Sequence, residues 1–218
     1  MHRAALILCS TLALAGSASA QGEPLDQGTL SIRVAEVEVG REQFAMISGR
    51  RGGLPGSTIR GVASYPTSRP KTRLTGILER TGPQTLAAFQ VEVAGELPSR
   101  TVAELSRNRL TVRTAAGDRE SAQELPGGPD LVALDDSVYS FWFAIPDLAT
   151  EEGTTLRFIF PRTGTRGTFV ARRESVPDAP SSIVLSGDIE GRIILDAEGR
   201  FNGLVLPARK VEVLRLSE

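Results

Sequence analysis

Residues 89–93 have the sequence Phe-Gln-Val-Glu-Val, in which apolar and polar side chains alternate one by one. The same alternation occurs in residues 30–34, Leu-Ser-Ile-Arg-Val, and in residues 110–113, Leu-Thr-Val-Arg. Successive side chains of a β-strand point to opposite faces of a sheet, so this period of two predicts half-buried strands.

Further segments with this composition are expected to form strands, namely residues 43–48, 58–65, 73–80, 138–145, 155–161, 167–174, 182–186, 189–195, 200–206 and 211–216. Glycine and proline lie between them, as in Pro-Gly-Gly-Pro at 126–129, and mark turns. These connections are too short for the crossover helices that parallel strands need. About 12 strands at this spacing predict an all-β, antiparallel fold, built as a strongly curved sheet, a partly open barrel or a sandwich.

One segment departs from the strand pattern. Residues 99–105, Ser-Arg-Thr-Val-Ala-Glu-Leu, favour a helix over 99–108 with Ser99 or Thr101 as its N-cap. We therefore expect at most one short helix in the fold.

The first 20 residues have the three-part pattern of a secretory signal peptide. Residues 1–3, Met-His-Arg, give a positive start, residues 4–15 form an apolar run, and residues 18–20, Ala-Ser-Ala, offer a cleavage site between small side chains. No later stretch approaches the roughly 20 apolar residues of a transmembrane anchor. We expect cleavage near Ala20 and a periplasmic or extracellular protein.

The rest of the chain, residues 21–218, is expected to form a single domain, with the Pro- and Ser-rich segment 175–182 as an extended connection. The only histidine, His2, and the only cysteine, Cys9, lie in the expected signal peptide. Its removal takes away Ser-His-Asp and Cys-His catalysis and nearly all zinc and copper sites, so we predict neither a metal site nor a cofactor. A formal net charge of −1 gives no global attraction to nucleic acid.

Carboxylates are the remaining candidates for catalysis. Asp135-Asp136 and Glu151-Glu152 are adjacent pairs, and neighbours in a strand point to opposite faces, which suits an acid and base couple poorly. The aspartates precede an expected strand, where turn formation is the simpler explanation. The acids at 188, 190, 196 and 198 lack the dense spacing of a calcium loop, although calcium binding there stays open.

Large aromatic side chains gather in two expected strands. Within 138–145, one face carries the three rings at 139, 141 and 143, and Trp142 lies on the other; residues 158–160, Phe-Ile-Phe, repeat the pattern. A strand that is apolar on both faces is covered twice, or else one face lines a ligand cavity. The candidate ligand-lining residues are Tyr139, Phe141, Phe143, Phe158 and Phe160.

Two pairs of adjacent arginines are candidates for the rim of such a cavity. Arg50, Arg51, Arg172 and Arg173 could hold an acidic head group by charge-assisted hydrogen bonds. Charged strand ends that block edge-to-edge aggregation are the alternative explanation.

The ends of the chain resemble a loose group of uncharacterised exported bacterial β-proteins. The likeness rests on residues 28–33, Gly-Thr-Leu-Ser-Ile-Arg, on residues 39–44, Val-Gly-Arg-Glu-Gln-Phe, and on the hairpin at 196–200, Asp-Ala-Glu-Gly-Arg. Some of that group are similar to periplasmic lipoprotein carriers, whose incomplete barrels hold acyl chains. The carriers place helices across the barrel mouth, whereas this chain offers at most one, so no site residue is transferred.

Taken together, these patterns favour a non-catalytic exported protein that binds an apolar or amphipathic, lipid-like molecule in the cell envelope. The alternative is a structural or protein-binding β-sandwich that acts through a sheet edge or a loop face, with an envelope protein as its partner. A carboxylate-based hydrolase is the third possibility.

Overall fold

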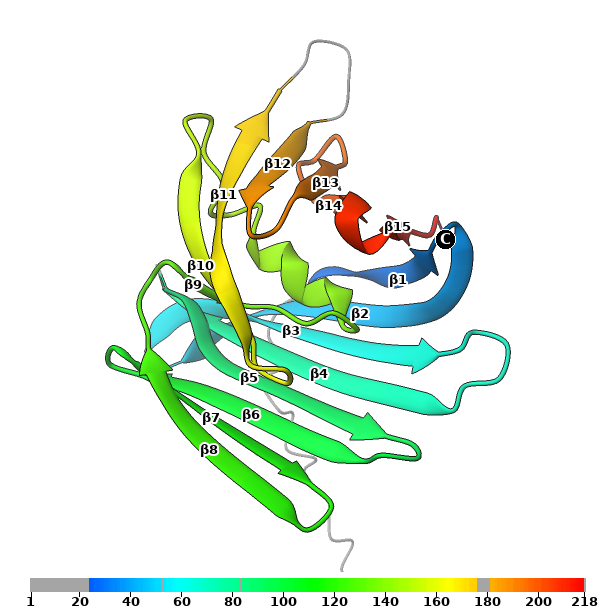
Figure 1. The fold of residues 1–218 in the computed structure, drawn as a ribbon. Coiled ribbons are helices and arrows are strands. Elements are labelled where there is room, and N and C mark those ends of the chain that lie inside the picture. The colour runs from blue at the N-terminus through cyan, green and yellow to red at the C-terminus, as the bar shows by residue number, and fades with distance from the viewer. Residues whose placement is uncertain (1–23, 52, 83, 176–180, 218) are drawn as a thin grey trace, which may run out of the picture.

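The computed structural model describes residues 24–51, 53–82, 84–175 and 181–217, and 67% of them belong to the strands of one curved sheet (Figure 1). The expected signal peptide, residues 1–20, lies outside the described residues, as does most of the connection 175–182. None of the described helices is long and apolar enough to cross a membrane.

The first eight strands form an antiparallel meander. They are β1 (Pro24–Val34), β2 (Val37–Arg51), β3 (Leu54–Tyr65), β4 (Thr72–Thr81), β5 (Gln84–Ala94), β6 (Ser99–Ser106), β7 (Arg109–Ala116) and β8 (Arg119–Pro126). Strands that follow one another in the sequence are paired throughout this series, so short turns suffice to connect them.

The second part of the sheet is a smaller meander. Its elements are β9 (Leu131–Ala133), the 3₁₀-helix η1 (Tyr139–Ala144), β10 (Thr154–Phe160), β11 (Thr165–Glu174), β12 (Ser182–Gly187), β13 (Gly191–Leu195), β14 (Phe201–Leu206), η2 (Pro207–Arg209) and β15 (Val211–Arg215). Apart from a short parallel ladder between β9 and β10 and one parallel bridge, the described pairings are antiparallel.

The two meanders are joined by the pairing of β1 with β15, in which Leu30 lies opposite Arg215 and Val34 opposite Val211. The result is a single open sheet of 15 strands, with β8 at one edge and β9 at the other. The predicted all-β, strongly curved antiparallel fold is confirmed, and the barrel is not closed.

The sheet curls around η1, which lies between its two halves in Figure 1. Helix η1 contacts β2 and β3, and β9 contacts β5 across the curl. Alternate side chains of the strands point inward and are buried, as Leu30 and Ile32 are in β1 and Phe89 and Val91 in β5. The period-two pattern therefore marks the concave face of the sheet.

The expected helix at 99–108 is wrong, because these residues form β6. Thr101 and Ala103 are buried while Glu104 is exposed, which is the alternation of a strand. Both edges of β6 are paired, to β5 and to β7. Ladder hydrogen bonds on two sides outweigh the weak helix preference of a short segment.

The expected strand at 138–145 is also wrong, because residues 139–144 form η1. All six residues of the helix are buried inside the curl. No neighbouring strand is available there to supply ladder hydrogen bonds, whereas a helical turn satisfies part of its backbone internally. The three rings at 139, 141 and 143 consequently do not share one strand face.

Candidate functional site

The rings of η1 fill the interior of the sheet. Phe141 packs edge-to-face on Phe89 of β5, with ring centroids 5.2 Å apart. Phe143 lies between Phe44 of β2 and Phe201 of β14, at centroid distances of 4.7 and 4.5 Å. These contacts connect the two meanders through one helix.

The remaining candidate rings of the helix and of β10 are buried as well. Tyr139 is buried at the start of η1. Phe158 and Phe160 lie on one face of β10 with centroids 5.5 Å apart, and the Arg209 guanidinium lies 4.9 Å from the Phe160 ring centroid. Ile159, on the opposite face, is buried too, so β10 is covered on both sides.

The described candidate head-group arginines make contacts within the protein. Arg50 donates to the backbone oxygen of Gly53 in its own turn, while Arg172 bonds Glu174 and Arg173 donates to the Pro146 oxygen. The side chain of Arg51 lies outside the described part of the structure. Each described member is therefore engaged within the protein.

Two glycines allow the helix segment to approach the sheet. Gly61 of β3 and Gly76 of β4 are directly opposite each other. A Cβ on Gly76 would lie 2.6 Å from Cζ of Phe141, and a Cβ on Gly61 would lie 2.6 Å from the Ser140 hydroxyl. A side chain at either position would push the segment away, so glycine is needed for the close approach.

Glu42 of β2 holds the start of η1. Its carboxylate accepts hydrogen bonds from the backbone nitrogens of Tyr139, at 2.6 Å, and Ser140, at 3.1 Å. Glu42 is completely buried, with 0% of its surface exposed, and this burial raises the pKa of its carboxyl to about 7. No cationic side chain is bonded to it within the described residues, so the hydroxyl of Ser140 and the backbone N–H groups of Tyr139 and Ser140 are what favour the charged form of Glu42.

Glu42 is a residue that the sequence analysis missed. Glu42 lies two and four residues before Phe44 and Met46, so its side chain points to the same, concave face of β2 as theirs. A charged residue on the apolar face of a strand is the signal that could have identified it.

A second buried carboxylate precedes the helix. Asp135 accepts hydrogen bonds from the backbone nitrogens of Ser137 and Val138, and Arg162 holds both its oxygens at 2.6 and 2.9 Å. Burial raises the pKa of Asp135, and the Arg162 guanidinium opposes that rise. Arg162 also bonds the exposed Asp136. These adjacent aspartates form and anchor a turn.

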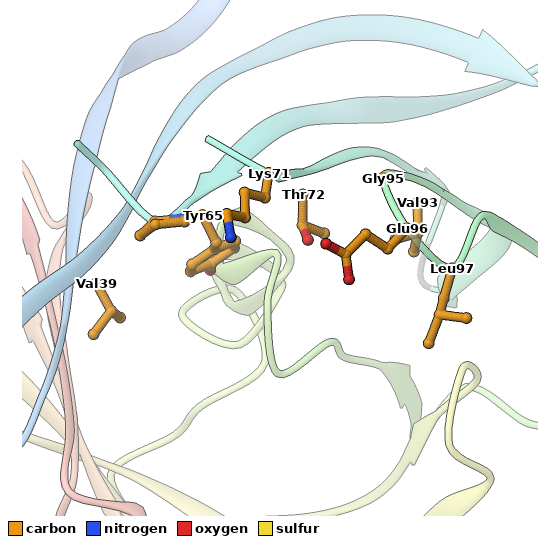
Figure 2. A pocket seen from close by; sticks show the side chains of 9 residues that line it. Val39, Tyr65, Lys71, Thr72, Val93, Gly95, Glu96 and Leu97 are labelled. Carbon is orange, nitrogen blue, oxygen red and sulfur yellow. The ribbon is translucent and has the colours of Figure 1, made fainter. Parts of the chain in front are cut away.

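The side of the interior beside this turn contains an open hollow. Tyr65, at the end of β3, donates its hydroxyl to the Ser137 oxygen at 2.8 Å and lines a hollow of about 570 Å³. Apolar walls come from Val39, Tyr65, Pro66, Val93 and Leu97, and the polar lining from Lys71, Thr72, Gly95 and Glu96. Figure 2 shows Thr72 between the charged side chains of Lys71 and Glu96.

A β-bulge brings Val39 into this hollow, which we call the mouth hollow. Ile32 pairs with Gly40 and Arg33 with Glu38, so Val39 is the extra residue of β2. The side chain after a bulge changes its direction relative to the regular alternation. The other apolar walls are Tyr65 and Val93, at the ends of β3 and β5, and Pro66 and Leu97 in the loops that follow these strands. No local sequence pattern places them together.

Exposed apolar side chains surround the same end of the sheet. Among the described residues, Val34, Val37 and Leu97 are large apolar residues left open to water, with Val37 64% and Leu97 86% exposed. They lie at the β1–β2 turn and in the β5–β6 loop, close in sequence to the Val39 and Val93 walls. Leu97 also lines the mouth hollow itself.

Comparisons with protein-family models, with curated proteins and with solved structures found no match to this chain. Within the described ranges, no group of three or more His, Cys, Asp or Glu side chains is placed to hold a metal ion. The chemistry that the mouth hollow offers is therefore apolar contact together with one ammonium and one carboxylate group.

Proposed function

We propose that the protein binds an amphipathic, lipid-like molecule without catalysing a reaction, and that the mouth hollow is its binding site. The observation that carries this proposal is a hollow of about 570 Å³ whose lining includes Val39, Tyr65, Pro66, Val93 and Leu97. Small-molecule sites in proteins have volumes of about 300–1,000 Å³ and few polar groups among apolar ones.

The apolar part of the molecule would lie against Val39, Val93 and the ring of Tyr65. Val39, Tyr65 and Val93 are only partly buried and pack on the core from its open side. A chain placed there would remove their remaining surface from water and cover Leu97. Burying the side chain of one leucine contributes about 1.5–3 kcal/mol.

The head group would lie between Lys71 and Glu96. These exposed side chains offer a cation and an anion on the same side of the hollow. A zwitterionic group, with a phosphate and an ammonium, matches both charges, whereas a purely anionic group would meet the repulsion of Glu96. We therefore propose a zwitterionic head group.

The five rings singled out from the sequence stand behind this site, since η1 and β10 fill the interior that the mouth hollow adjoins. The buried anchor at Glu42 and Asp135 keeps the segment 135–144 fixed against the sheet. In this proposal the rings support the site from within, and ligand contact by them stays a prediction.

Replacing Leu97 with glutamate should weaken binding of a single-chain phosphatidylethanolamine by at least about tenfold, because a carboxylate replaces an apolar wall. Isothermal titration measures the affinity. Leu54→Glu is the matched control. Leu54 is also exposed, at 55%, but it lies at the start of β3, whereas the mouth hollow lies at the other end of this strand, beside Tyr65. Equal weakening by both substitutions would contradict the proposed site.

The head-group assignment has its own test in a charge swap. Lys71→Glu and Glu96→Lys should each weaken binding, and the double variant should recover part of the lost affinity because both charges are again present. Native mass spectrometry of protein purified from its own envelope identifies the natural occupant. Lipid-free protein, together with unchanged affinity in both single variants, would exclude this function.

A further inference from the structure

Strand β8 is an open edge of the sheet. It pairs with β7 on one side, and no strand of the described chain pairs with its other side. Seven of its eight residues are exposed, and Leu125 is partly buried. An open strand edge presents unpaired N–H and C=O groups that can bind another strand.

The turn between β7 and β8 determines which backbone N–H and C=O groups of β8 point away from β7, to the open side of the strand. Residues 117–118 form a two-residue turn closed by the pair Ala116 and Arg119. The closing residues of such a turn are hydrogen-bonded to each other, so Arg119 and every second residue after it face β7. The backbone groups of Glu120, Ala122 and Glu124 therefore point to the open side.

The side chains of these same three residues form one face of the edge. Their neighbours in β8, such as Gln123 and Leu125, lie opposite Val112 and Leu110 of β7 and so share the concave face. Glu120, Ala122 and Glu124 consequently project from the convex face, where all three are exposed. A strand added to the edge would meet two carboxylates separated by a small side chain, of which Glu124 is already paired with the exposed Arg109 of β7.

A second copy of this chain is a poor occupant of the edge. If two β8 strands paired in antiparallel fashion, each residue whose N–H and C=O groups point to the open side would have to lie opposite another such residue. Two two-fold arrangements of β8 with itself pair seven residues each. One centres on Ala122 and places Glu120 opposite Glu124 twice; the other centres on Gln123 and places Glu120 opposite Pro126, which has no N–H to donate. Like charges directly opposite each other destabilise a strand pair.

The inner side of the edge offers room for an apolar side chain. A hollow of about 280 Å³ lies where the end of β8 approaches β10 and β11, and its walls include Leu110, Leu125 and Phe158. Arg157 of β10 fixes this approach by donating to the backbone oxygens of Pro126 and Gly127.

We infer that β8 binds an extended segment of a partner protein by strand addition. The segment that fits carries basic side chains four residues apart, opposite Glu120 and Glu124, and an apolar side chain that reaches the hollow beside Leu125. Main-chain hydrogen bonds provide affinity in this mode of recognition, and alternate side chains provide specificity. The site is separate from the mouth hollow, and it does not depend on the proposed lipid.

The test uses a synthetic decapeptide of alternating threonine and valine with lysines at two positions four residues apart, and a matched peptide with glutamates at those positions. The lysine peptide should bind the protein at least tenfold more tightly in fluorescence anisotropy. Ala122→Pro removes an outward N–H and leaves the β7 ladder intact, as proline does at an edge, and should weaken binding at least tenfold. Ala122→Thr keeps the N–H and should bind like the parent protein.

Charge reversal separates strand addition from simple attraction. Glu120→Lys with Glu124→Lys should reverse the preference between the two peptides, while Ala122→Pro should still prevent binding of either. Lipid binding at the mouth hollow should be the same in all these variants. Lysine-peptide binding that Ala122→Pro leaves unchanged, or a dimer in sedimentation that Ala122→Pro dissociates, would overturn the inference.

Discussion

Replacing Arg162 with alanine should lower the free energy of unfolding by about 3–5 kcal/mol, because it leaves the buried carboxylate of Asp135 without its charged partner. Only 2% of the Asp135 side chain and 20% of the Arg162 side chain are exposed. Two backbone N–H groups still reach Asp135, but they do not replace a bidentate guanidinium. Chemical denaturation followed by circular dichroism measures the change.

A surface ion pair of similar length is the matched control. Arg109 lies 2.6 Å from Glu124, with 74% and 57% of the two side chains exposed. Arg109→Ala should cost no more than about 1 kcal/mol, as is usual for exposed pairs. Equal losses in the two variants would mean that Asp135 does not need its partner, and the buried anchor would lose its assigned role.

The stability of the protein should fall as the pH rises from about 4.5 to about 7, and Glu42 should account for much of that fall. Burial raises the pKa of Glu42 from 4.5 to about 7 in the folded state. In this interval the unfolded chain has lost the proton while the folded protein retains it, so folding becomes less favourable with rising pH. The full effect is on the order of 3 kcal/mol and is complete above pH 7.

Glu42→Gln should remove this part of the pH dependence, since glutamine does not titrate. The measurement is the difference between the unfolding free energies of the parent and the variant at pH 4, 5, 6, 7 and 8. Asp135, whose pKa is also raised by burial, is present in both proteins and contributes with the same sign to each, so the difference between them reports Glu42 and its coupling to Asp135. Glu104→Gln, at an exposed position of β6, is the control; parallel parent and Glu42→Gln curves would disprove the assignment.

Local alternation was enough to predict most of the sheet. Segments such as 30–34, 89–93 and 110–113 keep a strict period of two because one face is always turned to the interior. Strand β8 was not predicted from the sequence, because this strand lacks such an apolar face. Its residues are almost all exposed, so no apolar positions mark its faces. Its pairing is visible only through the register with β7.

The errors at 99–108 and 138–145 arose where tertiary context overrides local preference. β6 is a strand because both neighbours pair with it, and η1 is a helix because it lies inside the curl, where Glu42 supplies an acceptor from a strand almost 100 residues earlier. The mouth hollow could not be predicted from the sequence either. Its walls come from a bulge, from the ends of two strands and from the loops that follow them, and these meet only in the folded sheet.

The pairing of the first strand with the last constrains how the chain can fold. Leu30 and Arg215 face each other across this ladder although almost the whole chain separates them. Closing so long a loop loses more chain entropy than any hairpin of the meander, and topologies dominated by such distant contacts fold slowly. Each meander can form strand by strand from its own turns. The pairing that joins the two meanders forms only after β15 has been synthesised, and until then their apolar concave faces stay exposed to water. We therefore expect nascent or truncated chains to expose the apolar face of an incomplete sheet, which is the kind of surface that chaperones bind.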